Sequence, residues 1–357
     1  MKERQSNIEL LRIISMFFIV LEHILIMGTD FFSTQAGCYR YVANMIIGFT
    51  YIGVNCFILI TGYFGAEFKW KRVLSLYLIC GFYELVGLIV AYYHGDTQFN
   101  MEALSYILFP LSHSNIWFIR CYVILLFLLP IINAGLNQMS KNQFVYALIA
   151  LTALNIYFGW FQKQPDFNIT GYTASQMLYV YVIGRYLNRF VNKETLRIYQ
   201  RQIFIGWIVL AIVWGIVQNI FNGWYSIPHW NGWAYNNPIV LLASILFFAY
   251  FCSLQVRNSK WINLVSGSML AVLLIHLNRY LGSYICDVVR NVIYSKFIGN
   301  SIVMQVMTLI AIAVGLVLIF GIIDMPRMWV HKWLLRQYDN LIIYLGKHRG
   351  TLINGEK

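Results

Sequence analysis

Long apolar segments separated by short polar ones run along almost the whole chain. Each apolar segment has about 20 residues, the length that an α-helix needs to cross the hydrocarbon core of a bilayer. We therefore predict about ten transmembrane helices, at residues 8–28, 45–64, 73–93, 115–134, 144–162, 172–188, 203–221, 238–254, 262–283 and 302–324. The eighth and ninth have the weakest patterns, because Gly267 and the polar residues 276–279 interrupt them.

The composition agrees with this pattern. Of the 357 residues, 59% are hydrophobic and only 11% are charged, and the mean hydropathy is +0.63. A soluble domain of this length does not reach such values, so the sequence predicts an all-α, polytopic helix bundle in a membrane. The segments between the helices are too short to fold as domains, and any chemistry must therefore lie between the helices.

The basic residues indicate how the helices are oriented. Of the 26 Lys and Arg residues, four lie on one side of the predicted membrane, four lie at or inside helix ends, and the remaining eighteen lie on the other side. The positive-inside rule assigns that richer side, with both termini, to the cytoplasm. The net charge of +12 is therefore mostly a signal of topology, and no basic soluble module for binding nucleic acid is present.

The predicted topology divides the chain into two parts. Residues 1–325 form a membrane-embedded domain. From Pro326 onward, Trp and Leu alternate with Lys and Arg at helical spacing. Residues 326–357 are therefore expected to form an amphipathic cytoplasmic tail along the inner membrane surface.

The first predicted helix carries two ionisable residues on one face. Arg12 and His23 are eleven residues apart in the sequence, which is close to three helical turns and about 16 Å along the axis. Ionisable groups within a membrane span are costly and usually functional, with an Arg near a helix end the common exception. The pair therefore suggests the two ends of one elongated ligand. Ser6 and Glu9 have the spacing of a capping box at the start of this helix.

Several other ionisable residues are expected to meet in a polar pocket below the outer surface. His23 and His276 both fall in the outer half of the bilayer, on helices that run outward. Glu84 lies near the middle of the third predicted helix, Arg120 lies a turn inside the fourth, and His113 lies at its mouth. Clustered titratable residues of this kind are typical of a functional site.

The cytoplasmic side has its own cluster of charge. Basic residues just before the third predicted helix are expected to form a cationic mouth together with Arg12: Lys69, Lys71 and Arg72. The positive-inside rule alone would also explain these three, so they are weak evidence for a site. The six cysteines are scattered and show no spacing typical of a metal site.

Other residues also have purely structural interpretations, which the sequence leaves open. The long side chain of Arg12 can reach the cytoplasmic interface. His23 has no such route, and its alternative is a histidine buried by a hydrogen bond to a neighbouring helix. His113 lies in a polar loop, where water can solvate it. Glu22 points about 100° away from His23 on the helix, so we expect it to pair with another helix.

Five segments of the chain carry recognisable motifs. The segment NIELLRIISMFFIVLEH, residues 7–23, has an Arg and a His separated by ten residues. Four later segments follow in order: YIGVNCFILITGYF at 51–64, KWKRVLSLY at 69–77, SNIWFIRCYVILLFLLP at 114–130 and SGSMLAVLLIHLN at 266–278. Together they resemble acyltransferase family 3, the integral-membrane acyltransferases that modify cell-surface glycans, whose first helix is marked by the same Arg and His. The resemblance covers most of residues 1–325. Thr61, Leu274 and Glu22 depart from the family pattern, where Ser, Tyr and His are common.

The resemblance implies a multi-pass protein of the bacterial plasma membrane that transfers an acetyl group from cytoplasmic acetyl-CoA. The acceptor would be a hydroxyl of an extracytoplasmic glycan or lipid-linked sugar, and acetyl-CoA would be a cosubstrate, with no cofactor or metal held by the protein. Arg12, Lys71 and Arg72 would bind the phosphates of the donor. His23 would act as general base or carry the acetyl group covalently. The remaining pocket residues would stabilise the oxyanion or position the acceptor: Arg120, His276, Glu84 and His113.

Other classes of protein stay open. A small-solute transporter would use the same intramembrane charges to bind its substrate or relay protons. Transporters commonly have repeats with helices broken at mid-membrane, whereas the six prolines lie in loops or near span ends. A scaffold or sensor would not require Arg12 and His23 on one face, and a glycan polymerase would need a large outer loop. Of these classes, only the acyltransferase would release free CoA thiol from acetyl-CoA.

Overall fold

The fold is built from helices. The computed structural model describes residues 4–33, 37–161, 167–168, 170–221, 234–296 and 301–354, and these ranges contain no β-strand. The predicted all-α class is therefore confirmed. The elements are α1 (Ser6–Met27), α2 (Cys38–Thr50), α3 (Gly53–Tyr63), α4 (Trp70–His94), α5 (Met101–Leu108), α6 (Trp117–Gln138), α7 (Lys141–Ile156), the π-helical η1 (Tyr157–Phe161), α8 (Ala174–Phe190), α9 (Lys193–Ile198), α10 (Gln200–Phe221), α11 (Pro238–Ser253), α12 (Lys260–Val265), the 3₁₀ turn η2 (Ser266–Ser268), α13 (Met269–His276), α14 (Gly282–Lys296) and α15 (Ile302–Asn354).

Helices occupy all ten segments that the apolar pattern marks. Within the described ranges, seven are long and apolar enough to cross a membrane: α1, the joined α2 and α3, α4, α6, α7 with the start of η1, α10 and α15. The other three are shorter, because α8 has 17 residues, α11 has 16, and η2 interrupts the segment Lys260–His276. Ten spans and cytoplasmic termini therefore stay predictions.

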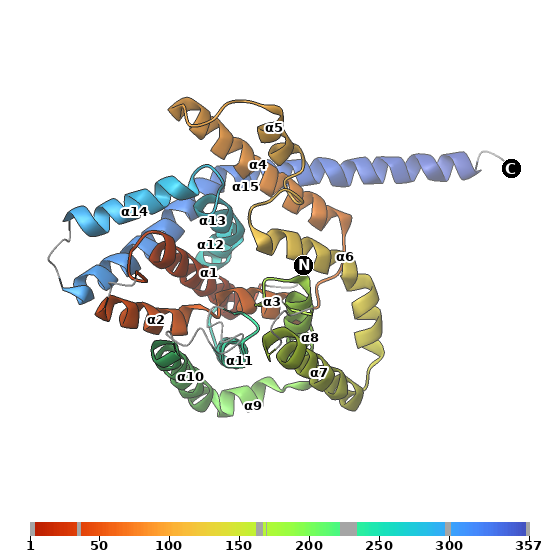
Figure 1. Cartoon of the computed structure of the whole chain (residues 1–357). Coiled ribbons are helices and arrows are strands. Elements are labelled where there is room, and N and C mark those ends of the chain that lie inside the picture. The colour runs from red at the N-terminus through yellow and green to blue at the C-terminus, as the bar shows by residue number, and fades with distance from the viewer. Residues whose placement is uncertain are drawn as a thin grey trace.

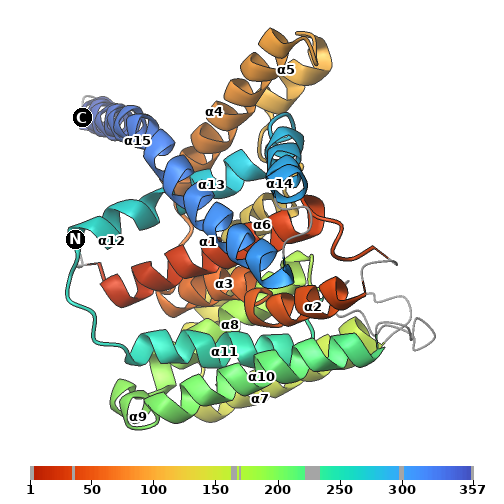
Figure 2. The same ribbon diagram turned by 90° about the vertical axis from the view of Figure 1, so that its left-hand side faces the viewer.

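Helix α1 crosses the middle of the bundle, between α3 and α13 (Figures 1 and 2). It packs against helices from both halves of the chain, which are α2, α3, α11, α12, α13 and α15. Many residues of α1 are therefore buried among the other helices. This central position is why α1 can carry both ends of a site.

The start of α1 differs from the predicted capping box. Gln5 takes the N-cap position, and no side chain caps the helix there. The Ser6 hydroxyl instead accepts a hydrogen bond from the backbone N–H of Ser259 (2.9 Å). Glu9 Oε2 lies 3.5 Å from Arg12 Nε as an ion pair. The capping prediction was wrong because contacts within α1 and with the segment before α12 occupy both side chains.

Two glycines allow α3 and α8 to approach closely. A Cβ atom at Gly62 would lie 2.2 Å from the carbonyl oxygen of Tyr181, and one at Gly184 would lie 2.5 Å from that of Leu59. Contacts this short do not occur, so only glycine fits at these positions. Small residues at helix crossings are the usual way to pack helices tightly in a membrane. The tight pair fixes α3, which forms one wall of the cavity described below.

Helix α15 continues without interruption from Ile302 through Pro326 to Asn354. Its C-terminal end projects beyond the other helices (Figure 1). Residues 326–354 are thus a helical extension of the last predicted span. Their place along a membrane surface stays a prediction.

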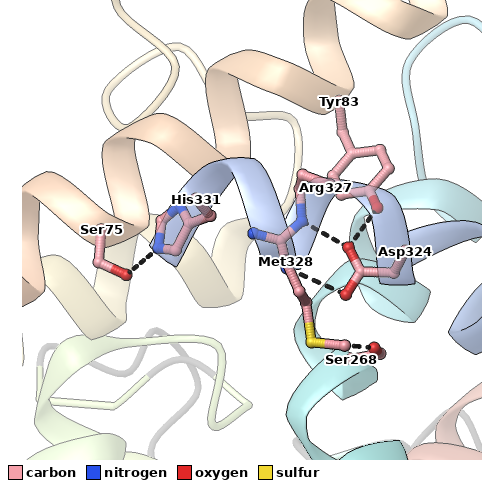
Figure 3. Close-up of polar contacts among 7 residues, drawn as sticks. All are labelled: Ser75, Tyr83, Ser268, Asp324, Arg327, Met328 and His331. Carbon is pink, nitrogen blue, oxygen red and sulfur yellow. Dashed lines mark hydrogen bonds and ion pairs between the residues drawn. The ribbon is translucent and has the colours of Figure 1, made fainter. Parts of the chain in front are cut away.

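A buried polar cluster joins α15 to α4 (Figure 3). Asp324 is fully buried and accepts hydrogen bonds from the Tyr83 hydroxyl (2.6 Å) and from two nitrogens of Arg327 (2.5 and 2.9 Å). One turn further along, Met328 Sδ accepts a hydrogen bond from Ser268 of η2 (3.7 Å). Charges in an apolar interior need partners of this kind. The cluster therefore fixes α15 against α4, and Met328 joins it to the broken segment of α12, η2 and α13.

The first prediction concerns this cluster. We expect Asp324→Asn to lower the free energy of unfolding by about 3–5 kcal/mol, because it leaves the Arg327 charge buried without its partner. Denaturant titration of the protein purified in detergent micelles measures this quantity. Asp339→Asn on the same helix is the matched control, since its ion pair with Lys71 is about half exposed and should contribute at most about 1 kcal/mol. Equal effects of the two substitutions would contradict the prediction.

Candidate active site

A cavity of about 780 Å³ follows α1 along most of its length. Its walls come from α1, α3, α4, the segment 115–122, the loops that hold Tyr172 and Tyr235, and η2 with α13. Arg12 and His23 both line the cavity, as their helical spacing predicts. The volume is in the range of sites that bind small molecules and cofactors.

His23 and His276 form a hydrogen-bonded pair. Nδ1 of His23 lies 2.9 Å from Nε2 of His276, and the ring centroids are 5.1 Å apart. His276 is buried behind His23 and is not among the residues that line the cavity. Its Nδ1 lies 2.7 Å from the carbonyl oxygen of Val272. A chain of polar contacts therefore leads from the backbone of α13 through His276 to His23.

The geometry assigns the protons when both rings are neutral. The Val272 carbonyl can only accept, so His276 carries its proton on Nδ1 and presents the lone pair of Nε2. His23 must then donate from Nδ1, which leaves its Nε2 with a free lone pair. Because Nδ1 is engaged with His276, Nε2 is the nitrogen available to the cavity. This arrangement makes His23 Nε2 suited to accept a proton.

The end of α13 places His276 at this position. His276 is the last residue of the helix, and the Asn278 side chain accepts hydrogen bonds from the backbone N–H groups of Tyr280 (3.0 Å) and Leu281 (3.3 Å). Asn278 also donates to the carbonyl oxygen of Tyr83 on α4 (2.9 Å). The turn after α13 therefore fixes where His276 lies relative to α1 and α4.

A second, smaller cavity of about 430 Å³ adjoins the first at its basic end. Arg12, Lys69 and Arg72 line it, and Arg12, Thr61 and Tyr122 line both cavities. Within the described residues, Arg12 Nε has no hydrogen-bond partner and only the ion pair with Glu9. The two cavities thus share a wall that carries an available guanidinium.

The predicted cationic mouth forms only in part. Lys71 lies outside the lining of both cavities, and its Nζ is 2.5 Å from Asp339 on α15. Lys69 is paired with Glu67 at 3.4 Å, and Arg72 donates to the Glu67 carbonyl oxygen (2.7 Å). Arg4, which was not predicted from the sequence, lines the larger cavity.

Of the residues expected in the outer pocket, the structure brings only His23 and His276 together. Arg120 is exposed and donates to the carbonyl oxygen of Ser114. His113 is also exposed, and Glu84 is buried on α4. None of Arg120, His113 and Glu84 is among the described residues that line the cavity. Their predicted depth does not bring them to one point, because they face different directions around the bundle axis.

The far end of the cavity has an aromatic wall that was not predicted from the sequence. Trp117, Tyr172 and Tyr235 line it, and Glu22 lines the cavity as well. Tyr172 and Tyr235 lie in polar loops, and neither residue has a sequence spacing that links it to α1. Trp117 lies in the segment 114–130, one of those whose sequence resembles the family.

The helices and the cavity together define an integral-membrane protein with a large internal cavity. A family model described as an acyltransferase domain, that of acyltransferase family 3, matches residues 5–325, nearly the whole chain. The chain belongs to this family, and it is a membrane O-acyltransferase. No curated protein and no solved structure matches it.

The second prediction tests the proton assignment. We expect nitrogen NMR of protein labelled with ¹⁵N-histidine to show His23 protonated at Nδ1 and unprotonated at Nε2 at neutral pH, because Nδ1 donates to His276. His23→Gln assigns the signal among the seven histidines, and His94→Gln is the control for substitution of an exposed histidine. A His23 protonated at Nε2 instead would contradict the assignment.

Proposed function

We propose that the protein transfers an acetyl group from cytoplasmic acetyl-CoA to a hydroxyl of an extracytoplasmic glycan or lipid-linked sugar. The observation that carries the proposal is the continuous set of lining residues from the basic cavity to His23. A ligand that fits this route needs negative charge at one end and a group that reacts with a base at the other. Acetyl-CoA has both features. On this proposal the protein lies in the bacterial plasma membrane and crosses it several times.

The basic end suits the phosphates of the donor. Arg12 and Arg72 can each form two parallel hydrogen bonds to a phosphate, and Lys69 adds a point charge. The pantetheine arm would follow α1 outward, over the roughly 16 Å that three helical turns provide. Its thioester would then lie beside His23. Lys71 has no part in this proposal, because it is paired with Asp339 outside both cavities.

His23 would act as the general base. Its Nε2 takes the proton of the acceptor hydroxyl while that oxygen attacks the thioester carbonyl carbon. The tetrahedral intermediate then breaks its C–S bond, and the proton on Nε2 passes to the leaving sulfur. The products are an acetyl ester and free CoA thiol. His276 would hold the imidazole in the reactive tautomer, which is a positioning role rather than contact with the reacting atoms.

The third prediction concerns this base. We expect His23→Ala to lower the release of CoA thiol and the transfer of labelled acetyl at least about 100-fold, because positioned general-base catalysis contributes this much or more. The assay uses membranes with matched protein levels, acetyl-CoA and cell-surface glycan. His94→Ala, which changes an exposed histidine at the end of α4, should keep full activity. Retained activity in His23→Ala would exclude the general-base role. Absence of CoA release by the wild type would favour a transporter instead.

The fourth prediction separates two adjacent basic residues. We expect Arg72→Ala to raise the KM for acetyl-CoA about 10- to 100-fold, the usual effect of losing a hydrogen bond to a charged group. Lys71→Ala should raise it less than about 2-fold, because Lys71 faces Asp339 in an exposed ion pair of small energetic effect. Initial rates at varied acetyl-CoA concentration give both values. A larger effect at Lys71 would place the donor phosphates elsewhere.

A further inference from the structure

Glu22 is a buried carboxyl group that has no hydrogen bond or ion pair in the described part of the chain, so the expected pairing with another helix was wrong. Its side chain is 3% exposed and lines the main cavity. Two other acidic residues are buried among the described residues. Asp324 has both Tyr83 and Arg327 as partners, whereas Glu84 Oε2 has no hydrogen-bond partner but Glu84 does not line the cavity. A buried polar group without a partner is costly, and a ligand in the cavity would supply one.

The aromatic wall lies next to this carboxyl group. Glu22 lies close enough to Tyr172 and Tyr235 to interact electrostatically with both. The ring centroids of Trp117 and Tyr172 are 4.7 Å apart, and those of Tyr172 and Tyr235 are 4.9 Å apart. Behind the wall, Tyr51 stacks on Tyr235 at 4.5 Å with an angle of 7° between the rings. One end of the cavity therefore combines flat aromatic faces with a buried carboxyl group.

The wall is held in a fixed position by the loops that carry it. The backbone N–H of Tyr235 donates to the carbonyl oxygen of Thr170 (2.9 Å). The Tyr235 carbonyl oxygen accepts from Asn55 of α3 and from Gln176 of α8, both at 3.0 Å. Gly171 has φ +85°, and a Cβ atom there would lie 2.6 Å from the Tyr235 Cβ atom. The two loops are therefore joined to each other and to the closely packed pair of α3 and α8.

We propose that Glu22 and the aromatic wall form the acceptor subsite, in which a sugar ring stacks on the wall and hydrogen-bonds to Glu22. The faces of aromatic rings are negative and attract the slightly positive C–H groups on the flat side of a pyranose. The Glu22 carboxyl group bonds a hydroxyl that is not acetylated. Glu22 and His23 both line the cavity, so the ring that hydrogen-bonds to Glu22 presents a second hydroxyl to His23. The acceptor is therefore a pyranose with at least two free hydroxyls.

This inference rests on the proposed reaction and makes a separate prediction about it, the fifth. Methyl pyranosides of glucose, galactose, mannose and N-acetylglucosamine are offered with acetyl-CoA, and the fastest acceptor is then compared with its monodeoxy analogues. We expect the wild type to react about 10-fold more slowly with one analogue that keeps the acetylated hydroxyl but lacks the hydroxyl bound by Glu22, because Glu22 loses its partner. In Glu22→Met, which keeps the length of the side chain without its polar group, this difference should disappear. The KM for the acceptor should rise, and the KM for acetyl-CoA should change less than about 2-fold.

Two further variants make the test specific. Trp117→Leu should raise the KM for the acceptor about 2- to 12-fold, and Trp117→Phe should restore most of the loss, because it keeps an aromatic face. Glu194→Gln, at an exposed position on α9, is the control for loss of a carboxylate and should behave like the wild type.

The outcomes distinguish this inference from the proposed function. If Glu22→Met and the wild type discriminate equally among the deoxy analogues while both release CoA thiol, the role of Glu22 is overturned and the acetyl transfer stands. If the wild type releases CoA thiol with cell-surface glycan but with none of the pyranosides, the sugar-ring subsite is overturned. If the wild type releases no CoA thiol with any acceptor, the proposed function itself fails.

Discussion

The hydrogen bond between His23 and His276 is the interaction on which the site depends. It exists because α13 ends at His276 beside α1, and that ending depends in turn on the turn around Asn278. The Val272 carbonyl assigns one proton, and this choice fixes the tautomer of both rings. A histidine deep in an apolar bundle would otherwise have no defined orientation. The hydrogen bond to the Val272 carbonyl thus determines the protonation of the His23 nitrogen that faces the cavity.

The polar groups inside the bundle are of two kinds. Asp324 pairs with Arg327 and also accepts a hydrogen bond from Tyr83, which holds α15 against α4. Within the described residues, Arg12 has only the ion pair with Glu9 and Glu22 has no hydrogen bond or ion pair, and both line the cavity. An apolar environment penalises an unsatisfied group, so the first kind is structural, and the second kind, where it lines a cavity, indicates where ligands bind. The contrast locates a site without reference to any ligand.

Sequence periodicity predicted some of this arrangement and missed the rest for identifiable reasons. The eleven-residue spacing of Arg12 and His23 placed both on one face, because a single helix determines the geometry. The depth of each residue along its predicted helix correctly placed His276 near His23. It also placed Arg120, Glu84 and His113 in the same pocket, because depth gives no information about the direction in which a side chain points around the helix axis. Lys71 and Arg72 are adjacent in the sequence, but their side chains point about 100° apart around the helix. Lys71 therefore forms an ion pair with α15, whereas Arg72 lies in the cavity wall. Tyr172 and Tyr235 meet only through tertiary contacts between distant loops.

The attachment of the aromatic wall has a consequence for how the protein can change over evolution. The histidine pair and the basic end lie on α1, α13 and the start of α4, whereas Tyr172 and Tyr235 lie on two loops that bond to each other and to α3 and α8. Substitutions in these loops can reshape one end of the cavity without moving the histidine pair or the basic residues. Descendants of one ancestral chain can therefore diverge in what this end of the cavity binds while they inherit the histidine pair and the basic end unchanged.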